Sequence, residues 1–244
     1  MNILFRPQPL YRSEMILAEA MADVTGDGIA DTIVLRGYPP SGDSPFLTEI
    51  TLIVTVGATP DRYVIPLPTN AGYHPTLFIG DFTGDKVDDV LVSIDSGGSG
   101  AITYNDIYTF TGGEARLIFD SEYFNSQWNY QVEYLDNYKL KVTSEHAGLV
   151  FVIDITGRGP DYLNEIYNPD GTLKQPIQGM VEPVSGLFPV DLERDGTYEL
   201  MLLQAVSGRY RADRFGYMTT VLRWNGAGWT MVQQWFSIYG ANVS

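Results

Sequence analysis

The sequence has no cysteine and only two histidines among its 244 residues. Without thiols the chain forms no disulfides or thiolate metal sites, and it has no cysteine nucleophile. Two histidines are too few for a histidine-rich zinc site. The chemistry open to this chain therefore rests on carboxylates, hydroxyls, amides and aromatic rings.

Positive charge is also scarce, since 15 Lys and Arg face 30 Asp and Glu and the formal net charge is −15. Such a chain repels nucleic acid and acidic membrane surfaces, so cations are its natural ligands. No apolar run approaches the roughly 18 residues of a membrane span. The first residues, MNILFRPQPLYRSEM, place Arg and Pro where a signal peptide needs an unbroken apolar core. We expect no membrane insertion and no signal peptide in this chain.

One pattern occurs three times, as MADVTGDGIADTIVLRG, FIGDFTGDKVDDVLVSI and FPVDLERDGTYELMLLQ. The first aspartates of the copies are Asp23, Asp81 and Asp191, and the second interval is close to twice the first. A missing copy is therefore expected near Asp136, in YQVEYLDNYKLKVTS, where a short turn without the acidic loop joins two alternating runs. A period of roughly 55 residues is typical of a repeat architecture.

Each unit reads as about four antiparallel strands joined by Gly-containing links, which is the composition of a propeller blade. The sequence predicts a single all-β domain over residues 1–244, a small β-propeller-like repeat domain of about four four-stranded blades. The stretch EMILAEAMA favours a helix by local propensity, but its position in the repeat predicts a strand. The expected units are residues 14–70, 74–121, 128–156 and 185–238, with an irregular insertion at 157–184 that holds one helical turn at 162–166.

The acidic loops have the spacing of a calcium site, in which side chains one, three, five and nine and the carbonyl of seven point inward. The predicted ligands are Asp23, Thr25, Asp27, the Ile29 carbonyl and Asp31 in the first loop; Asp81, Thr83, Asp85, the Val87 carbonyl and Asp89 in the second; and Asp191, Glu193, Asp195, the Thr197 carbonyl and Glu199 in the fourth. Gly28 and Gly196 can adopt the positive φ expected at position six. Lys86 stands there in the second loop, which predicts strain and the weakest site.

The loops are not EF-hands, because an EF-hand needs a bidentate Glu at position twelve and a helix on each side. Position twelve is occupied by Val34, Val92 and Leu202, all in expected strands. The alternative is that Asp and Gly only form good turns with solvated acids. Three copies in register favour a bound ion, because the clustered carboxylates would otherwise repel one another.

On these three motifs the chain resembles the FG-GAP/VCBS repeat, the calcium-loop blade of integrin α-subunit propellers and of many bacterial surface proteins. The stretch IYNPDGTLKQPIQG with VSGLFPVDLERDGTYEL also resembles VCBS-repeat proteins of spore-forming Gram-positive bacteria. The resemblance implies calcium binding and a role in adhesion or ligand binding more often than in catalysis. The chain departs from that pattern in Thr25 and Thr83 at position three, in Lys86, and in one unit without the loop.

Catalytic signatures are weak. The segment DSGGS, with Ser96 and Ser99, is similar to a serine-protease nucleophile stretch, but Ser-Gly recurs at the same place in other units and only His74 or His146 could act as its base. Paired carboxylates for glycoside cleavage stay open, since the pair need only be close in space.

Two further groups of residues have alternative interpretations. The loop RYRADRF, residues 209–215, is expected either to grip an anionic or glycan ligand or to be a solvated loop with an arginine paired to Asp213. Trp224, Trp229 and Trp235 are expected to pack between blades.

The sequence thus favours a non-catalytic module of the cell or spore surface, outside the cell, with two or three structural Ca²⁺ ions and a glycan or a surface protein as partner. The alternative is a carbohydrate-active or peptidase enzyme on a propeller scaffold. A deep pocket with convergent acids or histidines outside the loops would favour the enzyme. Oligomeric state is left open by the sequence.

Overall fold

Four antiparallel sheets follow one another along the chain in the structure, a computed structural model that describes residues 13–240. Residues 1–12, on which the signal-peptide prediction rests, lie outside the described part. The first sheet consists of β1 (Met15–Ala22), β2 (Asp31–Tyr38), β3 (Thr48–Thr55) and β4 (Arg62–Pro66), and the second of β5 (Tyr73–Gly80), β6 (Asp89–Asp95), β7 (Thr103–Thr109) and β8 (Arg116–Asp120). Within each sheet every strand pairs with the next strand in the chain. The all-β prediction is therefore confirmed.

The third sheet has three strands, β9 (Tyr130–Leu135), β10 (Lys139–Ser144) and β11 (Leu149–Asp154). Asn137 and Tyr138 join the first two with φ angles of 61° and 59°, the left-handed pair that a tight hairpin requires. The prediction of four strands in this unit is wrong, because the chain leaves the sheet after β11 and enters a short 3₁₀ turn, Thr156–Arg158, and α2 (Pro160–Ile166).

The fourth sheet contains the longest strands, β12 (Met180–Val190), β13 (Glu199–Ser207), β14 (Arg214–Trp224) and β15 (Trp229–Ile238). Two further short helical elements are a 3₁₀ turn at Thr111–Gly113 and α1 (Ser121–Gln127), which Asp120 caps by accepting the Glu122 and Tyr123 N–H groups. The segment EMILAEAMA forms β1, as its place in the repeat predicted. None of the helices in the described part is long and apolar enough to cross a membrane.

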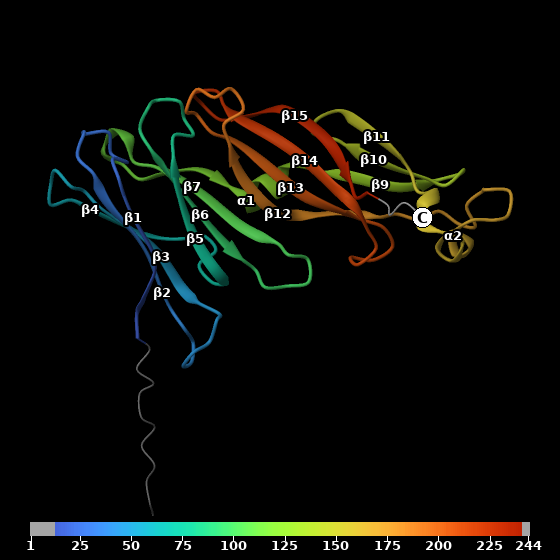
Figure 1. Cartoon of the computed structure of the whole chain (residues 1–244), viewed down its shortest axis with the longest axis horizontal. Coiled ribbons are helices and arrows are strands. Elements are labelled where there is room, and N and C mark those ends of the chain that lie inside the picture. The colour runs from blue at the N-terminus through green and yellow to red at the C-terminus, as the bar shows by residue number, and fades with distance from the viewer. Residues whose placement is uncertain (1–12, 241–244) are drawn as a thin grey trace, which may run out of the picture.

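The sheets pack in a row whose order differs from their order in the chain. Contacts join β1 to β5, β7 to β12, and β12 to β9, so the fourth sheet lies between the second and the third. Figure 1 shows this row running from the first sheet to the third, with α2 at the far end. A propeller places its blades around an axis in chain order. The propeller part of the prediction is thus not confirmed.

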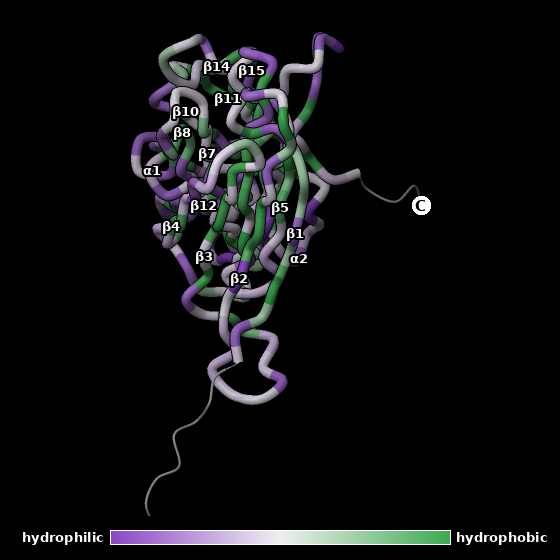
Figure 2. The backbone as a smooth tube through the Cα atoms, turned by 90° about the vertical axis from the view of Figure 1, so that its left-hand side faces the viewer, coloured by the Kyte–Doolittle hydropathy of each residue, from purple (hydrophilic) through white to green (hydrophobic). Residues whose placement is uncertain are grey.

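Three hydrophobic clusters hold the row of sheets together, and one lies at each junction between neighbouring sheets. The first lies between the first and second sheets and includes Ile33 and Phe110. The second joins the second sheet and α1 to the fourth sheet through residues such as Phe82 and Leu202. The third joins the fourth sheet to the third sheet and α2. In Figure 2 hydrophobic residues concentrate along the strands, while the connections are largely hydrophilic.

A buried carboxyl group lies on β7, the strand that contacts the fourth sheet. Asp106 is 5% exposed and pairs in register with Asp120. Burial first, and then the charges of Asp120 and Glu122, raise the pKa of Asp106 to about 7. The folded protein therefore holds this proton more tightly than the unfolded chain, in which an aspartate titrates near ~3.9.

The free energy of unfolding of the Asp106→Asn variant should increase relative to that of the unaltered protein as the pH rises from 5 to 8. The raised pKa means that Asp106 costs stability above the unfolded pKa, and the cost grows until the pH passes the folded pKa. Urea unfolding at both pH values should show a relative gain for the variant of about 2–3 kcal/mol at the higher pH. An equal effect at the two pH values would contradict this account.

Candidate cation-binding edge and aromatic cleft

The three acidic loops connect the first and second strands of the first, second and fourth sheets and share one conformation. At position one, Asp23 accepts the N–H groups of Gly26, Asp27 and Gly28 at 2.7, 3.1 and 2.8 Å. Equivalent bonds run from Gly84 and Lys86 to Asp81, and from Asp195 and Gly196 to Asp191. The first aspartate of each loop thus closes the turn.

Positions five and six also repeat. The carboxylates of Asp27, Asp85 and Asp195 each accept the N–H group two residues later, at 2.8 to 3.0 Å. The φ angle at position six is 85° at Gly28, 90° at Gly196 and 68° at Lys86. The predicted left-handed turn is confirmed in all three loops, and in the second loop a lysine adopts it.

The closing acid at position nine is buried in each loop. Asp31 and Asp89 are 0% exposed and Glu199 is 2% exposed. Each accepts the N–H group of position two at 3.0 Å, in the first loop from Val24. This side chain therefore joins the start of the loop to the start of the following strand.

The three loops lie side by side. A Cβ atom on Gly26 would stand 2.9 Å from the Val87 side chain, so the first loop touches the second. The Tyr198 N–H donates to the Asp81 carbonyl at 2.8 Å, which joins the second loop to the fourth. We call residues 23–31, 81–89 and 191–199 the acidic edge. It contains eleven Asp and Glu against Lys86 and Arg194.

The raised pKa of Asp88 reflects the concentration of negative charge at this edge. Its pKa is raised by burial first, and then by the negative charges of Asp81 and Asp23. Asp23 belongs to the neighbouring loop, so the field of one loop reaches the next. A cation bound anywhere along the edge would relieve this repulsion.

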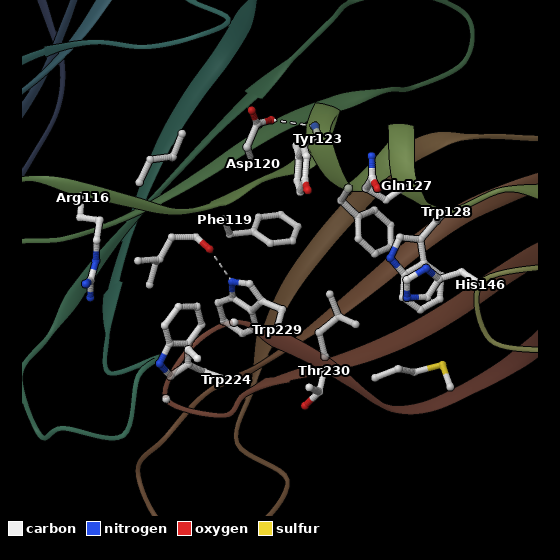
Figure 3. Close-up of a pocket in the computed structure, with 18 residues that line it drawn as sticks. Arg116, Phe119, Asp120, Tyr123, Gln127, Trp128, His146, Trp224, Trp229 and Thr230 are labelled. Atoms are coloured by element: carbon white, nitrogen blue, oxygen red, sulfur yellow. Dashed lines mark hydrogen bonds between the residues drawn. The ribbon is translucent and has the colours of Figure 1, made fainter.

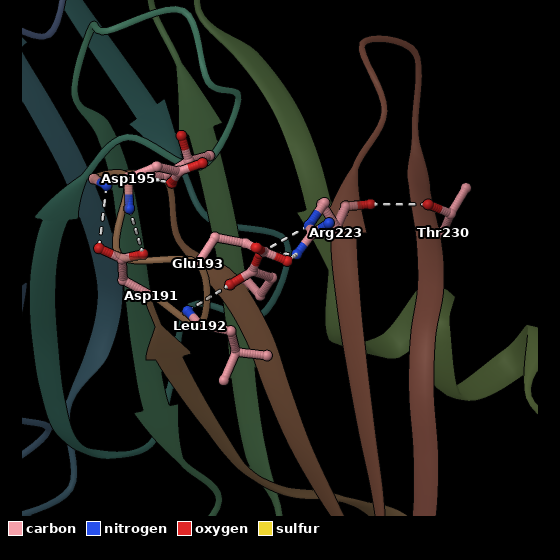
Figure 4. Close-up of polar contacts among 9 residues, drawn as sticks. Asp191, Leu192, Glu193, Asp195, Arg223 and Thr230 are labelled. Atoms are coloured by element: carbon pink, nitrogen blue, oxygen red, sulfur yellow. Dashed lines mark hydrogen bonds and ion pairs between the residues drawn. The ribbon is translucent and has the colours of Figure 1, made fainter.

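Arg223 of β14 neutralises part of the fourth loop (Figure 4). Its guanidinium forms ion pairs with Glu193 at 2.8 Å and with Glu199 at 2.7 Å. Two of the five predicted ligands of this loop therefore already face a positive charge. Sequence reasoning missed Arg223, because it comes from a different strand and carries no local signal.

The second loop holds two predicted ligand atoms that are buried and lack a hydrogen-bond partner of good geometry, Thr83 Oγ1 and Asp89 Oδ1, although the Thr109 hydroxyl lies close enough to the Asp89 carboxylate to favour its charged form. Burial raises the pKa of Asp89 to about 6. The sequence predicted this loop to be the weakest site on account of Lys86. Its Thr83 and Asp89 oxygens nevertheless fit the donor set that a hard cation prefers.

The predicted metal ligands are brought to one edge but not to one point. Within residues 13–240 no three Asp, Glu or His side chains converge closely enough to hold an ion in the present arrangement. The carboxylates of positions one, five and nine instead accept backbone N–H groups, as described above. The calcium sites remain a prediction.

A cleft of about 910 Å³ opens where β8 and α1 face the β14–β15 hairpin (Figure 3). Aromatic side chains dominate its lining, and the polar groups include Arg116, Asp120, Gln127, His146 and Thr230. The Trp229 Nε1–H donates to the Ile118 carbonyl at 2.7 Å and thereby links the fourth sheet to the second. The prediction that tryptophans pack between units holds for Trp229, which lies against the second hydrophobic cluster.

The two histidines have partners other than the serines of the DSGGS segment in the described part of the chain. His74 is exposed and its Nδ1 lies 3.2 Å from Asp95, whereas His146 stacks on Trp128. Neither histidine makes a hydrogen bond to Ser96 or Ser99 in the described part of the chain. The serine-protease similarity is therefore not supported by a base near either serine.

Asp213 of the RYRADRF loop is buried, and its side-chain partner comes from outside that loop. Arg158 Nη2 lies 2.5 Å from the Asp213 carboxylate, and the Tyr134 and Tyr162 hydroxyls donate to it at 3.2 and 2.7 Å. The expected pairing of Asp213 with an arginine is confirmed, but the arginine is Arg158 of the insertion, since Arg209 pairs with Glu165. The expectation that this aspartate is solvated is wrong, because it is 4% exposed. The network ties the insertion to the third and fourth sheets.

These features define an all-β protein of stacked antiparallel sheets with an acidic loop edge and an aromatic cleft. Residues 128–237, which cover the third and fourth sheets, match the family model of the YybI C-terminal domain. The chain is 44% identical over 232 residues to a Bacillus subtilis (strain 168) protein described as "Uncharacterized protein YybI", covering 95% of this chain and 88% of that relative. The chain belongs to the YybI family. No solved structure matches it.

Arg223→Gln should destabilise the protein more than Glu193→Gln does. Removing Arg223 leaves the charge of buried Glu199 unpaired, whereas Glu193 is an exposed partner whose loss costs little. In urea unfolding with EDTA, the decrease in midpoint should be at least about twice as large for Arg223→Gln.

The double variant Arg223→Gln/Glu199→Gln serves as the control, because it removes the buried Glu199 charge together with its partner Arg223. It should recover most of the lost stability. Equal decreases for the two single variants, or no recovery in the double variant, would show that Arg223 does not compensate Glu199.

Proposed function

We propose that this protein is a non-catalytic binding module whose acidic edge binds structural Ca²⁺ ions. The observation that carries the proposal is the side-by-side placement of three loops with eleven acids and two bases. Such a concentration of negative charge destabilises the folded state unless a cation offsets it. Calcium suits the edge because it accepts six to eight oxygen ligands in flexible geometry.

The loops are not equivalent in this proposal. The second loop offers the Thr83 and Asp89 oxygens, and within residues 13–240 no guanidinium forms an ion pair with the carboxylates of the first loop. In the fourth loop an ion must compete with Arg223. We expect two or three ions per chain, with the fourth loop the last to fill.

The setting we propose is the outside of a bacterial cell or spore. Calcium there is near millimolar, and extracellular modules bind it with dissociation constants of roughly 10⁻⁴–10⁻³ M. A partner on that surface would be a glycan or another surface protein. The up-and-down order of each sheet supports a relationship to FG-GAP/VCBS blades, with the blades stacked in a row.

The cleft favours binding over hydrolysis. Asp120 is the one carboxylate that lines it among the described residues, and its Oδ1 is occupied in capping α1. Glycoside cleavage generally requires two carboxyl groups that flank the bond. The enzyme alternative therefore lacks a second acid at this site.

Calcium should raise the melting midpoint at low ionic strength relative to EDTA, because it binds the folded state alone. At a concentration about a hundredfold above the dissociation constant, the increase should be roughly 5–10 °C for a chain of this size. Differential scanning calorimetry measures this directly. An unchanged melt, or an equal increase with sodium chloride of the same ionic strength, would contradict the proposal.

Asp27→Asn combined with Asp85→Asn provides the residue-level test. An asparagine oxygen can still accept the local N–H group, so the turn is kept while the charge is lost. The calcium-dependent increase should fall by at least about half. Glu114→Gln, an exposed acid outside the edge, is the matched control and should leave the increase intact.

A further inference from the structure

Six aromatic rings form a continuous strip along the cleft. Successive ring centroids lie 4.3, 5.0, 6.1, 5.8 and 5.5 Å apart in the order His146, Trp128, Phe124, Phe119, Trp229 and Trp224. The rings come from the β10–β11 turn, from α1 and the residue after it, from β8, and from β14 and β15. Figure 3 labels five of these rings, with His146 and Trp128 on one side of the cleft and Phe119, Trp229 and Trp224 toward the other. Three sheets therefore contribute to one series of rings, which we call the aromatic strip. Its middle members Phe119, Phe124 and Trp128 are buried, so the accessible rings are His146 at one end and Trp229 and Trp224 at the other.

The strip is held in place by the protein itself. Trp229 is anchored by its bond to the Ile118 carbonyl and by edge-to-face packing on Phe119. Trp128 is 8% exposed and is stacked between Phe124 and His146. These contacts occupy the faces of the middle rings and hold the end rings in place. A ligand would therefore stack on Trp229 and Trp224, which are already ordered, and this order lowers the entropic cost of binding.

Hydrogen-bonding groups accompany the rings. Within residues 13–240 the Trp128 and Trp224 indole N–H groups donate to no protein atom, and neither is among the buried polar atoms that lack a partner, so both are open to solvent or to a ligand. Gln127 and Thr230 add an amide and a hydroxyl group to the lining. Arg116 and Asp120 add one charge of each sign to the lining. Flat apolar faces beside several donors and acceptors suit a ligand that has an apolar face and hydroxyl groups at its edge.

We propose that the cleft binds an uncharged oligosaccharide. A pyranose ring presents a face of C–H groups that can stack on an indole, and its hydroxyl groups lie in reach of the polar rim. Because the accessible rings lie at the two ends of the strip, His146 at one end and Trp229 and Trp224 at the other, the cleft favours several linked sugar rings over one compact group. A cavity of about 910 Å³ is within the range of small-ligand sites.

The net charge of the chain excludes further classes of ligand. A net charge of −15 disfavours polyanionic polysaccharides and nucleic acids. A quaternary ammonium ligand would prefer a cage of rings around one point, and the strip instead runs in a line. This proposal rests on the proposed function of the protein as a binding module. It uses residues that are separate from the acidic edge, so the two proposals can be tested independently.

The test is a tryptophan fluorescence titration with cellotetraose, chitotetraose and maltotetraose, each up to about 5 mM. Because the cleft contains three of the four tryptophans, binding of at least one of these sugars should change the emission with a saturable curve. Trp224→Ala should weaken that binding by about tenfold or more. Trp235→Ala, which removes the tryptophan outside the cleft lining, should leave the dissociation constant within about twofold.

Thermal melts of both variants establish that they fold. Tyr123→Ala gives a second test should Trp224→Ala unfold, because Tyr123 lines the cleft and is 67% exposed. Failure of all three sugars to bind, binding that Trp224→Ala and Tyr123→Ala leave unchanged, or saturable binding of tetraethylammonium alone would overturn the proposal. The titrations are carried out in calcium and in EDTA. If none of the sugars binds but calcium still raises the melting midpoint, the proposal of sugar binding at the cleft is refuted, whereas the proposal of calcium binding at the acidic edge is retained.

Discussion

The architecture depends on the need of each sheet to cover its apolar face with a neighbour. The fourth sheet meets this constraint on two sides, because its side chains enter both the second and the third hydrophobic clusters. Among the described residues, the first sheet packs on the second through the cluster that includes Ile33. Burial of apolar surface contributes about 25 cal/mol per Å², so these junctions dominate the stability of the row.

The acidic edge and the aromatic cleft are both consequences of this stacking. Since the first, second and fourth sheets pack in sequence with their first hairpins in contact, the loops after β1, β5 and β12 come to one edge. The third sheet has no acidic loop, and its hairpin instead contacts the insertion, where Asp136 accepts the Leu173 N–H. The cleft opens where β8 and the β14–β15 hairpin meet across the junction of the second and fourth sheets.

Local features of the fold were accessible from the sequence, and long-range ones were not. Alternation and Gly-rich turns identified the strands, and the repeat placed β1 correctly against its helix propensity. Position six of each loop was predicted to be left-handed from Gly28 and Gly196 alone. The order of the sheets, the pairing of Arg223 with Glu199, and the bond from Trp229 to Ile118 depend on partners 24 to 111 residues away. No periodicity encodes such pairings, because they follow from which apolar faces match.

We propose that the packing of the sheets brings the three acidic loops to one edge of the protein, where they bind cations. Equilibrium dialysis against calcium at low ionic strength, with the metal content of the protein counted at saturation, tests it most directly. The account predicts two or three calcium ions per chain, and about one fewer in a chain that carries Asp85→Asn. A protein that retains no calcium under these conditions would contradict it, and the loops would then be turns whose carboxylates serve only their own backbone.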